Sequence, residues 1–429
     1  MLLTNNIAII ADDLTGANDT ALQFLMRGCN TQILFDYQAI PEGKSYTQAW
    51  AISTETRNED PDYAARKVYE ITQGLLFNFN FEHVYKKIDS TLRGNIAHEC
   101  WATMKALDYD AAVIVPAFPA ENRTTIGGYQ MLKGVPVERT EFARDPQNPI
   151  FESHIPTLLR QQVKEENYDD IDLIQFSTVT KGAGPILVEL QSMIQQGKKL
   201  IVIDAMSKTD LEQIALAVKK CTYKVLPCGA AGLAQAFAGI WLADVNYHHI
   251  KKVIADLPVL IVSGSATDIT KNQLMRLEEE EEVDAYFVKV PVEKVFSEPE
   301  QDYAQRIADS LKRVGVSVVQ IEDFDCSDEF LENHNITKTE LSSIITDFLG
   351  KLTRKIVDLQ ELILVSVGGE TSYKCCHSLD SKNLQLIDEV EPAIPLCLDY
   401  NSQWVITKSG NLGNPKTLIN IVKYLEQHK

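Results

Sequence analysis

The chain has 429 residues, of which 45% are hydrophobic and 24% charged, and its formal net charge at pH 7 is −19. At about 150 residues per domain this length predicts two or three folded units, and the composition is that of a globular protein. The acidic balance argues against nucleic acid or an anionic membrane as a partner, because it provides no surplus of cations for phosphates. A small anionic substrate would need only a local basic site.

The N-terminal segment MLLTNNIAIIADD carries no basic residue ahead of its apolar run, so we expect no signal peptide. No segment reaches the roughly 20 consecutive apolar residues of a membrane span. The eight cysteines include no C-x-x-C pair, which favours reduced thiols over a disulfide framework. We therefore expect a cytoplasmic protein.

Short apolar runs alternate with longer segments of helical period. The predicted strands are Ile7–Ala11, Gln32–Phe35, Val84–Ile88, Ala111–Val115, Leu200–Ile203, Tyr223–Leu226, Val259–Ser263, Ala285–Val290, Val316–Ile321 and Leu362–Val367. The predicted helices include Thr15–Arg27, Pro61–Gln73, Leu211–Lys219, Gly232–Leu242 and Thr337–Leu359. Apolar strands separated by helices indicate an α/β fold with largely parallel sheets flanked by helices.

A domain boundary is predicted near residues 243–258, where one helix ends and a fresh strand follows. We therefore divide the chain into domains 1–250 and 251–429 and expect the active site in the cleft between them. The one charge block, Glu278–Glu282, is interpreted as a solvated face.

The first predicted strand runs directly into Asp12 and Asp13, followed by Thr15 and Gly16 at a predicted helix start. Ligands of open α/β sheets bind beyond the carboxyl ends of the strands. A carboxylate pair there suits the binding of polyol hydroxyls, or the acceptance of a proton from one. One of the two aspartates could instead be a helix N-cap.

A second polar segment, KKIDSTLRGN at 86–95, also follows a strand. It combines cations with an aspartate and hydroxyls, which suits a substrate that carries both a carboxylate and hydroxyls. Ser90 and Thr91 could equally cap the next helix. Arg57 follows a third strand end and is expected to reach the same pocket.

A long segment rich in proline and glycine runs from Pro116 to Pro149 and carries Arg123, Lys133, Arg139, Arg144 and Asp145. Segments of this kind in a compact domain are functional loops or β-hairpin arms. A surface arm and a direct catalytic role are both left open.

Three turns of small residues follow strands in the C-terminal half, namely VSGSAT at 262–267, GGETS at 368–372 and TKSGNLG at 407–413. Small residues let backbone amides approach a phosphate, so three such turns predict a polyphosphate cradle. The P-loop-like pattern from Gly410 to Thr417 is rejected, because Pro415 lacks the N–H that a phosphate would need. No G-x-G-x-x-G follows the first strand, and the histidines form no zinc motif, so no protein-only metal site is predicted.

These segments, in this order, resemble the four-carbon acid sugar kinase family: ADDLTGAND, KKIDSTLRGN, the PAFP…DPQNP arm, GAAGLA at 229–234 and the three small-residue turns. The resemblance spans nearly the whole chain. It implies an N-terminal domain that binds a sugar acid, a C-terminal domain that binds ATP, and a 4-phosphorylated tetronate as product. Two places depart from the family pattern: Asn411 and Leu412 stand where Gly and Phe are expected, and the arm has Asn122 where a Gly next to the Arg is expected.

Carried over by position, the resemblance implies substrate contacts from Asp12, Asp13, Arg57, Lys87, Asp89, Ser90 and Thr91. It implies nucleotide contacts from Ser263, Ser265, Gly368, Gly369, Glu370, Thr371, Gly410 and Gly413. D-Threonate or D-erythronate is favoured over a 3-oxo-tetronate by the form of residues 17–20. A homodimer is one assembly that the sequence allows.

The expected reaction is in-line transfer of the ATP γ-phosphoryl group to the terminal hydroxyl, with Mg²⁺ bridging the phosphates. Asp12 or Asp13 is expected to take the proton, with Asp89 as the next choice. Lys87 and Arg57 would hold the sugar carboxylate, and Glu370 would help to hold Mg²⁺ or the ribose. Two alternatives are a non-catalytic sensor of sugar acid and nucleotide, and a nicotinamide dehydrogenase, which the missing fingerprint disfavours.

Overall fold

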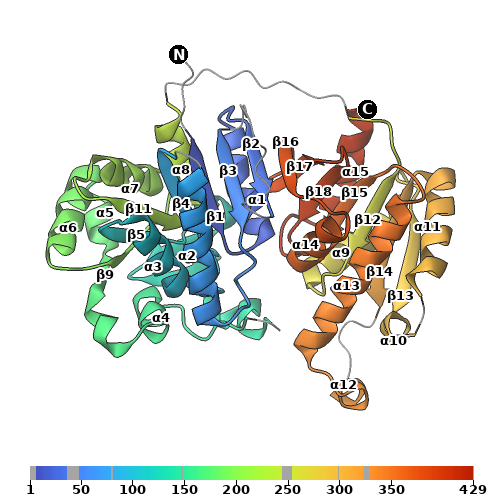
Figure 1. The fold of residues 1–429 in the computed structure, drawn as a ribbon, viewed down its shortest axis with the longest axis horizontal. Coiled ribbons are helices and arrows are strands. Elements are labelled where there is room, and N and C mark those ends of the chain that lie inside the picture. The colour runs from blue at the N-terminus through green and yellow to red at the C-terminus, as the bar shows by residue number, and fades with distance from the viewer. Residues whose placement is uncertain are drawn as a thin grey trace. The chain divides into compact units, whose positions relative to one another are not determined.

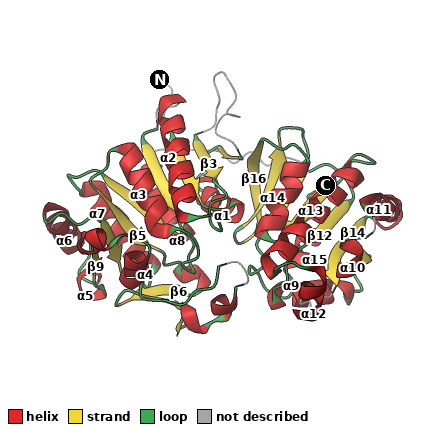
Figure 2. Ribbon diagram, turned by 60° about the horizontal axis from the view of Figure 1, so that its bottom comes forward, coloured by secondary structure: helices red, strands yellow, loops and turns green. Residues whose placement is uncertain are grey.

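The computed structural model describes residues 6–35, 48–78, 81–145, 148–243, 254–297, 299–322 and 328–428. The chain divides into two compact units, Met1–His248 and His249–Lys429, and each is described by itself (Figure 1). Both units are α/β, with helices flanking the strands (Figure 2). The interval 243–258, where a boundary is predicted, lies in part outside the described residues.

The first unit is built on a parallel sheet with the strand order β2-β3-β1-β4-β11-β5-β10-β9. The strands are β1 (Ile7–Ala11), β2 (Thr31–Leu34), β3 (Ala49–Ser53), β4 (His83–Lys87), β5 (Ala111–Val115), β9 (Ile171–Ile174), β10 (Leu200–Ile203) and β11 (Val225–Gly229). Buried apolar side chains fill most of these strands. That composition is typical of a parallel sheet that is covered on both faces.

Two layers of helices cover this sheet. The helices of the first unit are α1 (Leu14–Leu25), α2 (Pro61–Asn78), α3 (Ile96–Leu107), α4 (Ile155–Gln161), α5 (Phe176–Val179), α6 (Ala183–Gln195), α7 (Lys208–Lys220) and α8 (Ala231–Trp241). Helices α2, α3 and α4 share one apolar core with Ala8 and Ile10 of β1. Helices α1 and α8 pack on each other, and α8 also packs on α7.

The proline- and glycine-rich segment forms a β-hairpin arm. Its small antiparallel sheet consists of β6 (Arg123–Ile126), β7 (Tyr129–Leu132) and β8 (Val135–Pro136). The buried carboxylate of Asp204 anchors the arm, because it accepts hydrogen bonds from the backbone N–H groups of Gly127 and Gly128, each at 2.8 Å. Residues 146 and 147 of this segment lie outside the described residues.

The second unit has the strand order β13-β14-β12-β15-β18-β17-β16. Its strands are β12 (Val259–Ser263), β13 (Tyr286–Pro291), β14 (Val316–Glu322), β15 (Ile363–Val367), β16 (Asn383–Glu391), β17 (Ile394–Asp399) and β18 (Trp404–Lys408). The pairings from β13 to β18 are parallel, whereas β17 runs antiparallel to both β16 and β18. The sheet is therefore largely parallel, as predicted, with an antiparallel hairpin that the sequence analysis did not predict.

The helices of the second unit are α9 (Asp268–Glu278), α10 (Val292–Val295), α11 (Glu300–Val314), α12 (Asp328–His334), α13 (Lys338–Val357), α14 (Gly369–Ser378) and α15 (Thr417–Gln427). Helices α9 and α15 share an apolar core with alternate residues of β12, β15 and β18. Helix α13 packs on α11 and α14. The glutamate block Glu278–Glu282 follows the last turn of α9 and is exposed except at the half-buried Glu280.

No helix among the described residues combines the length and the apolar character needed to cross a membrane. The described cysteines are free thiols, and Cys326 lies outside the described residues. Burial raises the pKa of the Cys375 thiol to about 12, so this thiol is inert at neutral pH.

Candidate functional site

The sheet order of the first unit brings three polar strand ends side by side. Strand β1 lies between β3 and β4, and all three run parallel. Asp12 and Asp13 follow β1, Arg57 follows β3 by a few residues, and Asp89 follows β4. The backbone N–H groups of Thr56 and Arg57 both donate to the Asp12 carbonyl, at 3.0 and 3.3 Å. These hydrogen bonds fix the loop after β3 beside the two aspartates.

Arg57 forms a fork between the two aspartates. Its Nε and Nη2 lie 2.8 and 3.0 Å from the two oxygens of Asp12, and its Nη1 and Nη2 lie 2.7 and 2.6 Å from those of Asp13. Burial by itself would raise the pKa of Asp12, but the Arg57 charge outweighs it, so the pKa lies below its usual value. Asp12 therefore stays ionised, and all three guanidinium nitrogens of Arg57 are engaged.

Asp13 is also the N-cap of α1. It accepts hydrogen bonds from the Gly16 N–H at 2.9 Å and from the Thr15 hydroxyl at 2.7 Å. A side chain at Gly16 would not fit, because its Cβ would lie 2.5 Å from Asp13 Oδ1 and 2.8 Å from Lys87 Nζ. The sequence left open which of Asp12 and Asp13 caps the helix, and in the structure the cap is Asp13.

The two adjacent lysines of β4 have different surroundings. Lys86 is 0% exposed, and its ammonium lies 2.8 Å from the Glu99 carboxylate of α3. Lys87 lies beside the start of α1, where its ammonium is 3.9 Å from the Asp19 carboxylate. Lys86 thus forms a buried structural pair, and Lys87 is the lysine that faces the aspartates of α1.

Asp89 is held by two arginines. Arg93 Nε lies 2.9 Å from its carboxylate and Arg57 Nη2 lies 3.9 Å away, while the Thr91 hydroxyl also donates to it. Burial raises the pKa of Asp89, but the charges of Arg93 and Arg57 outweigh it and hold the pKa well below its usual value. The hydroxyl of Ser90 is hydrogen-bonded by Arg123 of the arm. The structure thus brings the seven sequence-predicted substrate residues into one neighbourhood around β1 and β4.

Two carboxylates of this neighbourhood were missed in the sequence analysis. The side chain of Asp19, on α1, is 21% exposed, and burial raises its pKa to about 6 even though Lys87 lowers it. Glu55 has a left-handed backbone, with φ at +50°, and burial raises its pKa to about 7. The available signal for Asp19 was the polar run Asn18–Thr20 inside a helix that is otherwise largely apolar.

In the second unit, the three small-residue turns lie at the ends of the adjacent strands β12, β15 and β18. The Thr267 hydroxyl donates to the Gly410 carbonyl at 2.9 Å, and the Gly368 N–H donates to the Lys408 carbonyl at 2.8 Å. The Gly264 N–H donates to the Val367 carbonyl at 3.2 Å. The turns are therefore bonded to one another, and they bring together Ser263, Ser265, Gly368, Gly369, Thr371 and Gly410.

Two predicted residues of the second unit have other surroundings. Glu370, in the first turn of α14, accepts hydrogen bonds from the Thr346 and Ser342 hydroxyls of α13, at 3.2 and 3.4 Å. Gly413 lies in the exposed limb of its turn. The Gln273 amide of α9 bonds the carbonyls on either side of this glycine.

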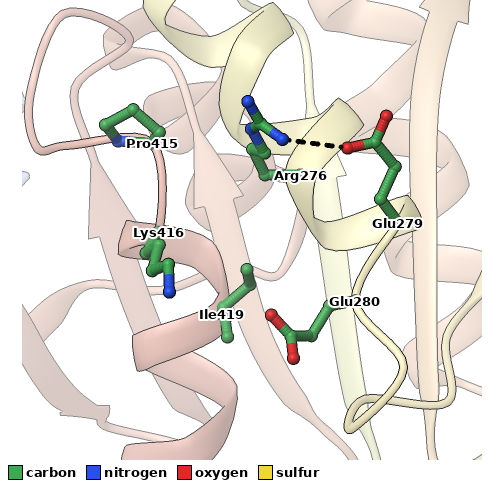
Figure 3. Close-up of a pocket in the computed structure, with 6 residues that line it drawn as sticks. All are labelled: Arg276, Glu279, Glu280, Pro415, Lys416 and Ile419. Carbon is green, nitrogen blue, oxygen red and sulfur yellow. Dashed lines mark hydrogen bonds and ion pairs between the residues drawn. The ribbon is translucent and has the colours of Figure 1, made fainter.

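The P-loop-like residues Pro415 and Lys416 lie outside the bonded turns. Both are exposed and line a separate surface pocket of about 500 Å³, together with Ile419, Arg276, Glu279 and Glu280 (Figure 3). This position agrees with the rejection of a P-loop. Within the described residues, no group of three or more His, Cys, Asp or Glu side chains is arranged to hold a metal ion.

The fold and these two clusters define a two-unit α/β protein with charged side chains at the strand ends of one sheet and small-residue turns at those of the other. Comparison with family models gives a sugar-binding N-terminal domain over residues 7–237 and a nucleotide-binding C-terminal domain over residues 260–418.

Relatives of known activity match the chain over nearly its full length. It is 31% identical to a D-threonate kinase of Salmonella typhimurium, with 98% of each chain covered. It is 29% identical to a D-erythronate kinase of Heliobacterium modesticaldum, over 98% of this chain and 97% of that one. A 3-oxo-tetronate kinase of Haemophilus influenzae is 25% identical, over 95% and 97%. The chain belongs to the four-carbon acid sugar kinase family.

Solved structures agree on the fold. A crystal structure from Salmonella typhimurium has a TM-score of 0.79 at 24% identity and covers 97% of this chain and 98% of that one. A second, from Haemophilus influenzae, has a TM-score of 0.71 at 22% identity, with 98% and 99% covered.

Proposed function

We propose that this protein is an ATP-dependent kinase that phosphorylates the 4-hydroxyl of a four-carbon acid sugar, with D-threonate or D-erythronate as substrate. The observation that carries the proposal is the full-length match to kinases of these acids. The higher identities to the D-threonate and D-erythronate kinases favour these acids over a 3-oxo-tetronate. Residues 1–250 would bind the sugar acid and residues 251–429 the nucleotide, in line with the two matching domain models.

The charged cluster of the first unit supplies what a hydroxy acid requires. Lys87 and Arg123 are the cations proposed to hold the sugar carboxylate, because Arg57 is already engaged by Asp12 and Asp13. Arg123 Nε is buried and forms no hydrogen bond with the residues that the structure describes. Arg57 keeps Asp12 ionised. The remaining lone pairs of the Asp12 and Asp13 carboxyl oxygens would accept hydrogen bonds from the sugar hydroxyls, beside Ser90 and Thr91.

Asp19 is proposed as the proton acceptor for the reacting hydroxyl. A general base works best when its pKa lies near the working pH. Burial raises the pKa of Asp19 to about 6, whereas the pKa values of Asp12 and Asp89 are lowered by the arginines that they bind. Asp12 and Asp89 are therefore weaker bases than Asp19.

The three bonded turns of the second unit are proposed to bind ATP through their backbone N–H groups and the hydroxyls of Ser263, Ser265 and Thr371. Magnesium, when bound, would neutralise the developing charge on the phosphates. Glu370 fits a supporting role beside it, because its carboxylate is oriented by the Ser342 and Thr346 hydroxyls of α13. In the first unit, the carboxylates of Asp12, Asp13 and Asp89 are engaged by arginines.

The test is an ADP-release assay on D-threonate, D-erythronate and the corresponding 3-oxo acids, with ³¹P NMR to locate the new phosphate ester. ADP release with D-threonate or D-erythronate, and phosphate on O4, is the expected result. Turnover confined to the 3-oxo acids would move the assignment to that branch. Nucleotide binding without turnover of any four-carbon acid would favour a sensor. Light scattering of the same sample measures whether the protein is a homodimer.

A further inference from the structure

Lys408, the last residue of β18, is buried at the small-residue turns of the second unit. Its side chain is 0% exposed. Its ammonium donates a hydrogen bond to the Ser409 carbonyl at 2.9 Å and forms no ion pair with the described carboxylates. A buried ammonium is costly unless an anion compensates it. Within the described part of the chain, no carboxylate supplies that anion to Lys408.

Lys86 of the first unit shows how this fold compensates a buried lysine for purely structural reasons. It is also 0% exposed, and the Glu99 carboxylate lies 2.8 Å from its ammonium. Thr56 donates a second hydrogen bond to the same carboxylate at 2.7 Å. The contrast indicates that the counter-charge for Lys408 is not supplied by the residues that the structure describes.

A second observation points to a ligand at the same place. The hydroxyl of Ser263, at the end of β12, is buried and has no hydrogen-bond partner in the described ranges of the chain. Ser263 is in register with Val367 of β15, and Val367 is in register with Lys408. Residues in register on parallel strands lie on the same face of the sheet. An unbonded hydroxyl and an uncompensated cation therefore lie on either side of Val367.

We propose that Lys408 binds a phosphate group of the nucleotide, with the Ser263 hydroxyl as a second donor to it. The inference rests on the proposed ATP-dependent function and adds a residue to it. A phosphate fits both needs, because it supplies the missing negative charge and accepts several hydrogen bonds. The carboxyl ends of β12, β15 and β18 are also where ligands bind in open α/β sheets.

The protonation of Lys408 gives this proposal a direct readout. Burial lowers the pKa of Lys408 to about 7. Among the carboxylates on neighbouring elements, Glu370 of α14 accepts hydrogen bonds from hydroxyls of α13, and Asp399 of β17 accepts one from the Ser381 hydroxyl. The acidic residues of the covering helices, Asp268 and Glu278 of α9 and Glu426 of α15, are exposed. At pH 8 most molecules therefore carry a neutral Lys408, and a bound phosphate would restore its positive charge. Nucleotide binding should then take up close to one proton.

The experiment is calorimetric titration of the full chain with ADP at pH 8, in two buffers with different ionisation enthalpies. The difference in the observed binding heat between the two buffers gives the number of protons taken up per bound ADP. Wild type should take up close to one proton. Lys408→Met should take up none and bind ADP about 10- to 100-fold more weakly. Lys416→Met is the matched control, because it removes an exposed lysine from the same loop and should behave as wild type.

The possible outcomes separate this inference from the function on which it rests. A wild-type protein that binds neither ADP nor ATP overturns the proposed kinase function. Wild-type binding without proton uptake, or with uptake that persists in Lys408→Met, overturns the role of Lys408. Proton uptake by the wild-type protein can be measured without any variant. Its absence therefore overturns the role of Lys408 even if Lys408→Met fails to fold.

Discussion

The two units of this chain end their central strands in contrasting ways. In the first unit, β1, β3 and β4 end in charged side chains that compensate one another, with Arg57 between Asp12 and Asp13. In the second, β12, β15 and β18 end in small residues joined by hydrogen bonds, and the buried Lys408 pairs with none of the described carboxylates. A compensated cluster selects a ligand by hydrogen-bond geometry, whereas an uncompensated one attracts it by charge. This difference suits a sugar acid and a polyphosphate, respectively.

The largest effect is expected from Asp19→Asn, which tests whether the first cluster has a proton acceptor among its compensated charges. Turnover should fall about 10²- to 10⁴-fold, the usual contribution of a general base. In wild type, kcat/KM should fall about tenfold per pH unit below about pH 6, because Asp19, with its pKa raised to about 6, must be ionised. A steady-state pH profile measures both.

The matched control is Glu55→Gln, which removes the other carboxyl with a raised pKa and should leave turnover near wild type. An acid limb near pH 7 that disappears in Glu55→Gln would assign the proton to Glu55 instead.

The stability of Asp19→Asn gives an independent check on the raised pKa of Asp19. Because folding raises the pKa of Asp19 from 3.8 to about 6, stability falls as the pH rises between these values, and the full loss persists at higher pH. Asp19→Asn should therefore raise Tm at pH 8.

Arg57→Ala should have the next largest effect, a loss of folding stability, because it leaves Asp12 and Asp13 without their shared counter-ion. Breaking a buried ion pair from one side costs about 3–5 kcal/mol of unfolding free energy. Denaturant unfolding measures the loss. Arg57→Lys keeps the charge but not the fork, and should recover part of the stability. Equal stability of Arg57→Ala and wild type would contradict the compensated arrangement.

Gly368→Ala tests whether the second cluster depends on close backbone packing. Gly368 has φ at +112°, and a Cβ there would lie 3.0 Å from the Thr371 hydroxyl. A strained backbone of this kind costs about 1–3 kcal/mol, and nucleotide affinity should fall with it. Gly315→Ala is the control, since Gly315 also has positive φ but open space around its Cβ. It should lose stability and keep nucleotide affinity.

Thr267→Ala should have the smallest effect. The Thr267 hydroxyl caps α9 and bonds the Gly410 carbonyl, so it joins the first turn to the third. Loss of an N-cap costs about 1 kcal/mol. A thermal melt should show this loss, and Thr267→Ser, which keeps the hydroxyl, should show almost none. A larger effect on ADP affinity than on Tm would mean that the turns are held together mainly by this one side chain.

The strand-end positions could be predicted from sequence because they follow from apolar runs alone. The bounds of Ile7–Ala11, Ala111–Val115, Leu200–Ile203 and Val259–Ser263 are as predicted. The hairpin Asn383–Glu391 and Ile394–Asp399 was missed, because its strands mix charged and apolar residues and contain a register shift. A strand that mixes charged and apolar residues gives a weaker signal in sequence than a continuously apolar, buried parallel strand.

The pairing of side chains could not be predicted, because it depends on which strands are neighbours. Arg57 contacts Asp12 and Asp13 because β3 lies next to β1 in the sheet. The order of strands in a sheet cannot be inferred from their separation along the sequence. Lys408 reads in sequence as an ordinary polar residue at a strand end. Its burial follows from α9 and α15, which cover the same face.

The anchoring of the β-hairpin arm has a consequence for how substrate range could change. The arm carries Arg123 to the Ser90 hydroxyl, yet its tip is attached to the sheet edge by backbone bonds to Asp204 and Ala205. These attachments use backbone groups of the tip, whereas Gln130 and Asp145 of the arm bond Ser90 and Arg93 through their side chains. Exchanging the tip between relatives while these side chains are kept is therefore a way to alter selectivity without moving the arm.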